Sequence, residues 1–147
     1  MRIHLGSDHG AIELRQALAA ALREWGHELV SEVGPVNAGE SVDYPDIARQ
    51  LAARVLADPG SLGVLACGTG QGMAMAANKV PGIRAAVVLD DYSAAKAREH
   101  NDAHVLCLGG RVVGVELAKL LLQTFLATEF AGGRHARRVA KIAGGGG

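Results

Sequence analysis

The chain has 147 residues, of which 49% are hydrophobic, and its 15 lysines and arginines balance its 15 aspartates and glutamates. This length and composition predict a single domain, residues 1–147, whose core is large enough to fold without cross-links. Zero net charge and only 3% aromatic residues argue against nucleic acid as a partner, because polyanion binders need basic surfaces and single-strand binders need stacking rings.

The cysteine count and the hydropathy pattern point to the compartment. Cys67 and Cys107 are the two cysteines, and the chain shows neither a signal peptide nor an apolar run long enough to cross a bilayer. We therefore expect a cytoplasmic protein without disulfides and without membrane contact.

Apolar runs of strand length alternate with helical patterns along the chain. Strands are expected at residues 2–7, 28–32, 62–66, 83–89 and 104–108. Helices are expected at residues 11–25, 45–57, 72–78, 93–100 and 113–130, followed by a separate basic helix within 131–139. Five strands joined by helices predict an α/β, Rossmann-like three-layer sandwich with a five-stranded parallel sheet and a C-terminal helical tail. The glycines at 144–147 are expected to be disordered.

The stretch from Cys67 to Lys79 is the most informative part of the chain. It ends an apolar strand with a thiol and a hydroxyl (Thr69), and glycines Gly68, Gly70 and Gly72 lead into the next helix. A helix start carries partial positive charge, which favours a thiolate and binds phosphates or oxyanions. A free cysteine is more often a buried hydrophobe, so the glycine-rich context carries the catalytic interpretation. The turn lacks the Lys-Ser/Thr ending of a nucleotide P-loop, which disfavours ATP.

Two other strand ends should lie beside this turn, because ligands of open parallel sheets gather beyond the carboxyl ends of the strands. The first strand ends at Asp8 and His9, and the fifth ends at Gly109, Gly110 and Arg111. A thiol, a hydroxyl, an acid–base pair and an arginine suit proton transfer on a small anion. Asp8 and His9 have a simpler alternative role, as a cap of the first helix.

Several sequence blocks, taken in order, resemble type B ribose 5-phosphate isomerases, a family that includes galactose 6-phosphate isomerase subunits. The blocks are Gly6–Gly10, 43–45, 67–70, 76–79, 82–85, 100–102, 109–114 and 132–135. The resemblance implies a Rossmann-like fold, dimers or dimers of dimers, and interconversion of aldose and ketose phosphates without metal or other cofactor.

The resemblance also implies a mechanism. Cys67 would act as the base that moves a proton between neighbouring carbons through a cis-enediolate, whose oxygen could be received by backbone N–H groups of residues 68–72. Other members use a glutamate shortly downstream, and here that position is Met73, which cannot accept a proton.

The remaining site residues also follow from the resemblance. Ring opening is assigned to His100 with help from Thr69, the sugar hydroxyls to Asp8, the pocket lining to Tyr44 and Asn101, and the phosphate to His9, Arg111, Arg134 and Arg138. Arginines suit phosphate because their planar fork offers two parallel hydrogen bonds. Gln71 and Arg137 receive no role.

The topology places His100 away from Cys67. His100 ends the helix after the fourth strand, and that helix should run back to the opposite edge of the sheet. We therefore expect a homodimer, with a tetramer as the alternative, in which His100 and the Arg134/Arg138 tail enter the site from a second chain.

Three alternatives stay open at this point. One is an isomerase of galactose 6-phosphate, allose 6-phosphate or a tetrose phosphate, since the loop at 34–41 and the tail after Gly133 would set the sugar length. The others are a non-catalytic phosphate-binding module of the same architecture and a supporting subunit of a hetero-oligomer.

Overall fold

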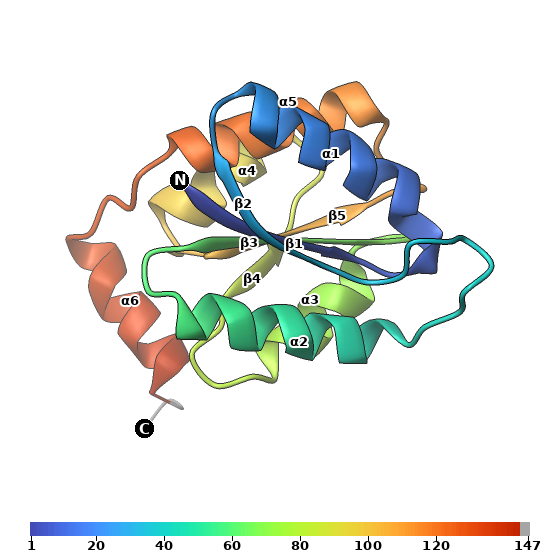
Figure 1. Cartoon of the computed structure of the whole chain (residues 1–147). Helices are drawn as coiled ribbons and strands as arrows, with labels where there is room; N and C mark the ends of the chain where they lie inside the picture. Colours follow the sequence, from blue (N-terminus) through green and yellow to red (C-terminus); the bar gives the residue numbers. More distant parts are fainter. Residues whose placement is uncertain (145–147) are drawn as a thin grey trace.

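The computed structural model describes residues 1–144 and has the predicted three layers (Figure 1). The strands are β1 (Arg2–Ser7), β2 (Glu28–Val33), β3 (Leu62–Cys67), β4 (Ala85–Val87) and β5 (Val105–Gly109), all parallel in the order β2-β1-β3-β5-β4. The helices are α1 (Ile12–Glu24), α2 (Tyr44–Ala57), α3 (Gln71–Asn78), α4 (Asp91–Glu99), α5 (Val115–Ala127) and α6 (Arg134–Ala143). The predicted α/β fold class is confirmed.

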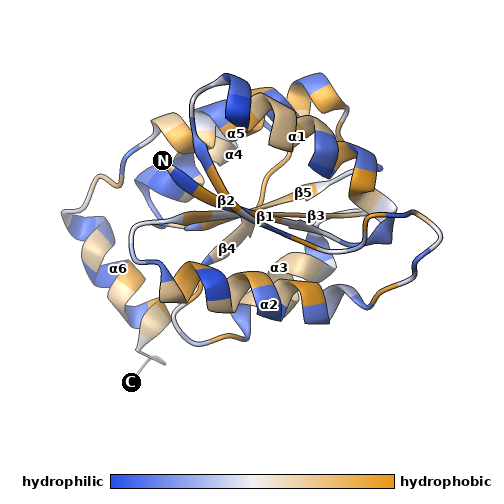
Figure 2. Cartoon of the chain, viewed as in Figure 1, coloured by the Kyte–Doolittle hydropathy of each residue, from blue (hydrophilic) through white to orange (hydrophobic). Residues whose placement is uncertain are grey.

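Helices cover both faces of the sheet because its central strands β3 and β5 are buried on both sides. In β3, Val64 and Ala66 face the core formed with α1, α4 and α5, whereas Leu65 and Cys67 face the core formed with α2 and α3. The helices match this with one apolar face each, as in α2, where Ile47, Leu51 and Val55 are buried while hydrophilic residues lie between them (Figure 2). No helix within residues 1–144 is long and apolar enough to cross a membrane.

The two ends of the sheet carry different parts of the chain. All five strands point in the same direction. The helix α6 lies beside their amino ends, whereas the loop between β2 and α2 lies beyond their carboxyl ends (Figure 1). This separation decides which predicted site residues can meet within one chain.

Some boundaries differ from the prediction for local reasons. The last long helix begins at Val115 because the N–H groups of Val112 and Val113 both bond to the Gly109 carbonyl in a turn. The strand β4 is shorter than expected, covering Ala85–Val87, and the Asn78 side chain pairs with the N–H and carbonyl of its first residue, Ala85. Gly144 is the C-cap of α6, and the disorder expected for the following glycines concerns residues outside the described range.

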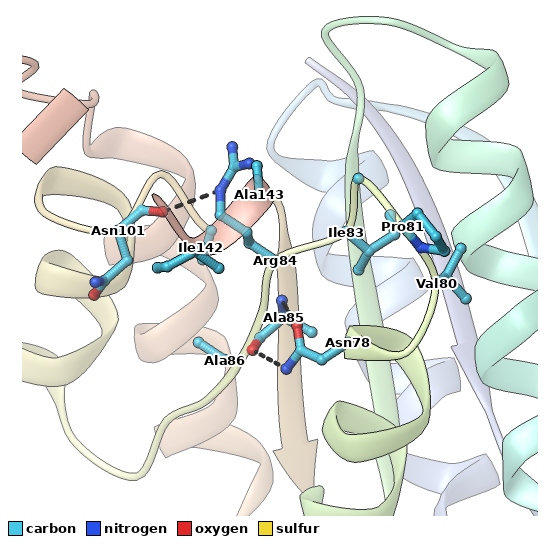
Figure 3. A pocket seen from close by; sticks show the side chains of 12 residues that line it. Asn78, Val80, Pro81, Ile83, Arg84, Ala85, Ala86, Asn101, Ile142 and Ala143 are labelled. Carbon is cyan, nitrogen blue, oxygen red and sulfur yellow. Dashed lines mark hydrogen bonds between the residues drawn. The ribbon is translucent and has the colours of Figure 1, made fainter. Parts of the chain in front are cut away.

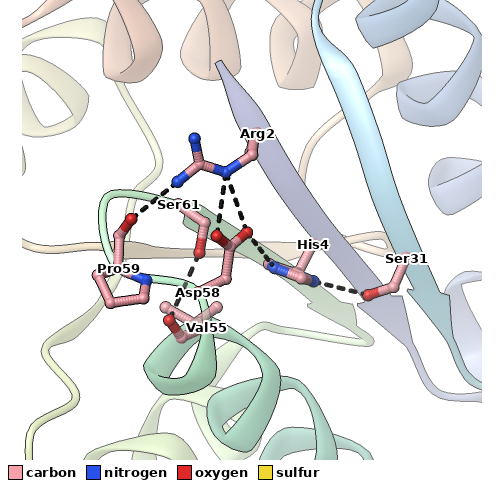
Figure 4. A network of polar contacts seen from close by, with 7 residues as sticks. All are labelled: Arg2, His4, Ser31, Val55, Asp58, Pro59 and Ser61. Atoms are coloured by element: carbon pink, nitrogen blue, oxygen red, sulfur yellow. Dashed lines mark hydrogen bonds and ion pairs between the residues drawn. The ribbon is translucent and has the colours of Figure 1, made fainter.

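A polar network closes the amino end of the sheet (Figure 4). Buried His4 bonds to Ser31 Oγ through Nδ1 (2.7 Å) and to Asp58 Oδ2 through Nε2 (3.2 Å), and Arg2 Nε donates to Asp58 Oδ1 (3.0 Å). Burial would raise the pKa of Asp58, but the bonds from His4 and Arg2 outweigh it, so the pKa is lowered. This network ties β1 to β2 and to the end of α2.

Candidate active site

Cys67 ends β3 and is buried, with 5% of its surface exposed. Its Sγ accepts a hydrogen bond from the Gly70 N–H (3.1 Å), and Gly70 has a left-handed backbone (φ +82°) that lets the chain turn back toward the sulfur before α3 begins. The strand-to-helix position predicted for Cys67 is confirmed. The Gly70 N–H therefore points at the sulfur atom that the sequence offers as the base.

The next N–H group in the turn has a different target. The Gln71 N–H donates to Thr69 Oγ1 (3.3 Å), which orients the hydroxyl of an exposed residue. Two of the N–H groups expected to receive an enediolate oxygen therefore face side chains of the turn itself. Gln71, for which the sequence offered no role, contributes through its backbone.

The turns after β1, β3 and β5 are hydrogen-bonded to one another. Gly110 N–H donates to the Cys67 carbonyl (2.8 Å), Arg111 N–H to the Gly68 carbonyl (3.0 Å), and Asp8 N–H to the Ala66 carbonyl (3.2 Å). These bonds fix the three strand ends as one unit, as the sequence predicted.

Asp8 and His9 lie directly beyond β1. Asp8 is 9% exposed, and its Oδ1 accepts the Gly10 N–H (2.9 Å), which caps the short 3₁₀ helix His9–Ala11. The capping role weighed for this pair is therefore real for Asp8. His9 is half-buried, and its Nδ1 accepts the Val42 N–H (3.2 Å).

Arg111 and Tyr44 complete this group. The exposed Arg111 side chain lies over Gly68, where an added Cβ would stand 3.7 Å from Cδ and from Nη1. Tyr44 opens α2 with its ring against Gly72, where a Cβ would stand 2.6 Å from the ring. Tyr44 lines an open hollow of ≈ 580 Å³ together with Asp8 and His9.

The other predicted residues lie at the opposite end of the sheet. His100 follows α4, and its ring stacks on that of His135 in α6, with centroids 4.2 Å apart. Arg134 and Arg138 are exposed on the same helix. Burial and the neighbouring positive charges of His100 and the two arginines lower the pKa of His135.

Asn101 belongs to this second group. It lines a hollow of ≈ 370 Å³ between the start of β4 and the end of α6, and its carbonyl accepts a bond from Arg84 Nε (3.2 Å) (Figure 3). The hollow does not include the Cys67 turn. His100 lies at the amino end of β5, and Cys67 lies beside Gly109 at its carboxyl end. The four residue steps of β5 span roughly 13 Å, so the group around His100 and the group around Cys67 do not meet within one chain.

The second cysteine behaves as core. Cys107 is fully buried on the same face of the sheet as Cys67, and burial, with Cys67 nearby, raises the pKa of its thiol. Within residues 1–144, no three His, Cys, Asp or Glu side chains lie close enough together to hold a metal ion.

Sequence reasoning missed Arg15, a buried arginine in α1 that bonds to the ends of β1 and β2. It also missed the stacking of His135 on His100. For Arg15 the signal was present, because the residue adjoins Leu14 and precedes Leu18 by three positions on the apolar face of the helix.

A Rossmann-like sheet with a thiol, an arginine and an Asp–His pair at its carboxyl edge defines an α/β protein built to act on small anions. The chain belongs to the ribose/galactose isomerase family, whose model matches residues 3–142, and it is a sugar-phosphate isomerase of that family.

Relatives of the chain cover nearly its whole length. It is 43% identical to ribose-5-phosphate isomerase B of Escherichia coli over 96% of this chain and 93% of the relative. It is also 43% identical to D-erythrulose-4-phosphate isomerase of Pectobacterium atrosepticum, over 97% and 93%. The solved structure of ribose-5-phosphate isomerase B from Clostridium thermocellum superposes with a TM-score of 0.94, at 49% identity over 98% and 96% of the two chains.

Proposed function

We propose that this protein interconverts ribose 5-phosphate and ribulose 5-phosphate, with Cys67 as the base. The observation that carries the proposal is the Cys67 thiol at a strand end, with the Gly70 N–H on its sulfur at 3.1 Å and Asp8, His9 and Arg111 on the adjoining turns. The thiolate takes the proton from the carbon next to the sugar carbonyl, which leaves a cis-enediolate. The same group returns the proton to the neighbouring carbon.

The phosphate is assigned to His9 and Arg111, which flank the turn on the β1 and β5 sides. Arg111 is exposed above Gly68, and its planar fork can take two phosphate oxygens. Asp8 holds sugar hydroxyls through the carboxylate oxygen that does not cap the 3₁₀ helix, and Tyr44 closes the side of the hollow. Thr69 assists ring opening.

His100 acts on the site of a second copy of the chain. One chain alone keeps His100, Asn101, Arg134 and Arg138 at the amino end of the sheet, so a homodimer with shared sites supplies the group that opens the sugar ring. Inactive Cys67→Ala and His100→Ala proteins should regain up to about a quarter of wild-type activity when mixed, because random exchange gives half heterodimers with one intact site each. Confirmed subunit exchange without regained activity would contradict shared sites.

A second substrate, a tetrose phosphate, is favoured by the name of the Pectobacterium relative. The decisive experiment compares turnover of ribose 5-phosphate and of D-erythrulose 4-phosphate by wild type and Cys67→Ala, with a chelator present. We expect faster turnover of the pentose and a loss of about 10²–10⁴-fold in the variant, the usual contribution of a general base. Equal rates in both proteins would remove Cys67 as the base, and faster tetrose turnover would replace the substrate.

A further inference from the structure

Arg15 is a buried charge that the proposed mechanism does not use. Arg15 is 5% exposed within the apolar face of α1, and its Nη1 donates to Ser7 Oγ (3.0 Å) and to the Val33 carbonyl (3.3 Å). Its Nη2 donates to the Pro35 carbonyl (2.5 Å). The nearest carboxylate, on Glu32, lies 3.9 Å from Nε, beyond hydrogen-bond distance. Burying a charge costs free energy when no carboxylate bonds to it, and here the hydrogen bonds to three neutral oxygens offset part of that cost.

These acceptors belong to two strand ends and to the loop that follows. Ser7 ends β1 immediately before the site residues, Val33 ends β2, and Pro35 lies in the loop of residues 34–43, which we name the β2–α2 loop. The loop packs closely on Arg15, because a Cβ added at Gly34 (φ +122°) would stand 2.1 Å from the Ser7 carbonyl oxygen and 2.6 Å from Arg15 Nη1. Arg15 therefore fixes where the β2–α2 loop leaves the sheet.

Near its α2 end, the β2–α2 loop contacts His9. The Val42 N–H lies 3.2 Å from His9 Nδ1, and a backbone N–H can only donate, so Nδ1 is the acceptor and carries no proton. The neutral ring then bears its proton on Nε2. Loop residues also flank His9 on both sides, with Ala38 lining a hollow of ≈ 300 Å³ and Val42 lining the ≈ 580 Å³ hollow.

We propose that Arg15 is a positioning residue for substrate binding. It anchors the β2–α2 loop so that Val42 keeps His9 in the Nε2–H tautomer, which leaves that N–H as a donor for a phosphate oxygen. Loss of the anchor lets the loop move and frees Nδ1 to compete for the proton, so that phosphate binding weakens while the chemistry at Cys67 continues. The proposal rests on the proposed phosphate role of His9.

The kinetic test uses Arg15→Met, which keeps the apolar stem, and Arg15→Lys, which keeps the charge without the fork. The control is Arg23→Met, on the same helix but exposed and paired with Glu32 (3.3 Å). Residues that orient metal-binding histidines typically affect metal affinity by about 10–100-fold. By analogy, KM for ribose 5-phosphate should rise about 10-fold in Arg15→Met, less in Arg15→Lys and not in the control. The turnover number kcat should stay within about twofold, because the lost interaction serves ground state and transition state alike.

A second readout is independent of turnover. Nitrogen-15 NMR of the His9 ring, during titration with inorganic phosphate, should show the Nε2–H tautomer and phosphate binding in wild type. Arg15→Met should show a tautomer mixture and weaker binding by about 10-fold. A folded Arg15→Met with wild-type KM and tautomer, or with reduced kcat at unchanged KM, would overturn the proposal. If Arg15→Met does not fold, the same criteria apply to Arg15→Lys. A wild type that binds phosphate at His9 yet isomerises no sugar phosphate would refute the proposed function and leave this inference standing.

Discussion

Replacing Gly70 by alanine tests whether the Cys67 turn has room for any side chain. Gly70 and Gly26 share the same left-handed backbone angle (φ +82°), so Gly26→Ala serves as the matched control. An added Cβ at Gly26 meets nothing within 4 Å, whereas at Gly70 it would stand 3.0 Å from the Leu108 carbonyl carbon and 3.3 Å from the Gly109 nitrogen. Both contacts are to the backbone of β5, which cannot rotate away.

The expected magnitudes follow from these contacts. A left-handed alanine costs roughly 1–2 kcal/mol, and the reduced entropy of the unfolded chain returns part of it, so Gly26→Ala should lose about 1 kcal/mol of unfolding free energy. Overpacking adds about 1–3 kcal/mol at Gly70. The Gly70 variant should therefore lose about 2–4 kcal/mol in urea unfolding, and its Tm should fall several degrees below that of the control, at about 2–4 °C per kcal/mol.

The same substitution should reduce catalysis. The Gly70 N–H bonds to the Cys67 sulfur, and hydrogen bonds to charged groups contribute about 1.5–3 kcal/mol, so displacing the N–H should lower kcat by about 10- to 100-fold. Gly26→Ala should keep wild-type kcat. A Gly70→Ala protein as stable as the control and with wild-type kcat would refute this account of the turn.

Three further predictions concern the substrate hollow, the second group of site residues and pH. Gly72→Ala should push the exposed Tyr44 ring aside, because an added Cβ would stand too close to it. We expect KM for ribose 5-phosphate to rise a few-fold and the unfolding free energy to fall by less than about 1 kcal/mol. An unchanged KM would contradict this packing. Asp102 has a left-handed backbone (φ +44°) and accepts a hydrogen bond from Arg84 Nη2 (3.1 Å). Asp102→Ala should therefore lower the free energy of unfolding in urea by about 1–3 kcal/mol. It should also lower kcat, because the turn that follows α4 would be displaced. Burial, aided by the charge of Arg84, lowers the pKa of His104, so its neutral form is favoured on folding and stability should fall as pH drops below 6.5. His104→Gln should flatten that dependence in urea titrations at pH 7.5 and 5.5, and an unchanged slope would exclude His104 as its source.

The sequence predicted the elements well because their signals are local. Apolar runs of strand length, such as residues 62–66, and glycine-rich turns can be recognised without knowing what they contact. The sequence also predicted the separation of His100 from Cys67. A helix that follows a parallel strand must return the chain to the amino end of the sheet before the next strand begins. The structure confirms that separation within one chain.

Individual partners were harder to predict. His4 has no evident partner in the sequence, yet the fold brings Ser31 and Asp58 to its two ring nitrogens. The place of Arg15 on the apolar face of α1 could be seen in the sequence, but its acceptors, which come from β1, β2 and the β2–α2 loop, could not. In both cases the partners are separated from the residue along the chain, and no local pattern specifies such pairs.

The sequence by itself determined the alternation of strands and helices, the position of Cys67 at a strand end and the residues offered to the site. Only the tertiary structure decided the strand order β2-β1-β3-β5-β4, the donor on the Cys67 sulfur and the acceptors of Arg15. The physical reason is range: periodicity and turn chemistry act over a few residues, whereas strand order and side-chain partners depend on packing between segments far apart in the chain.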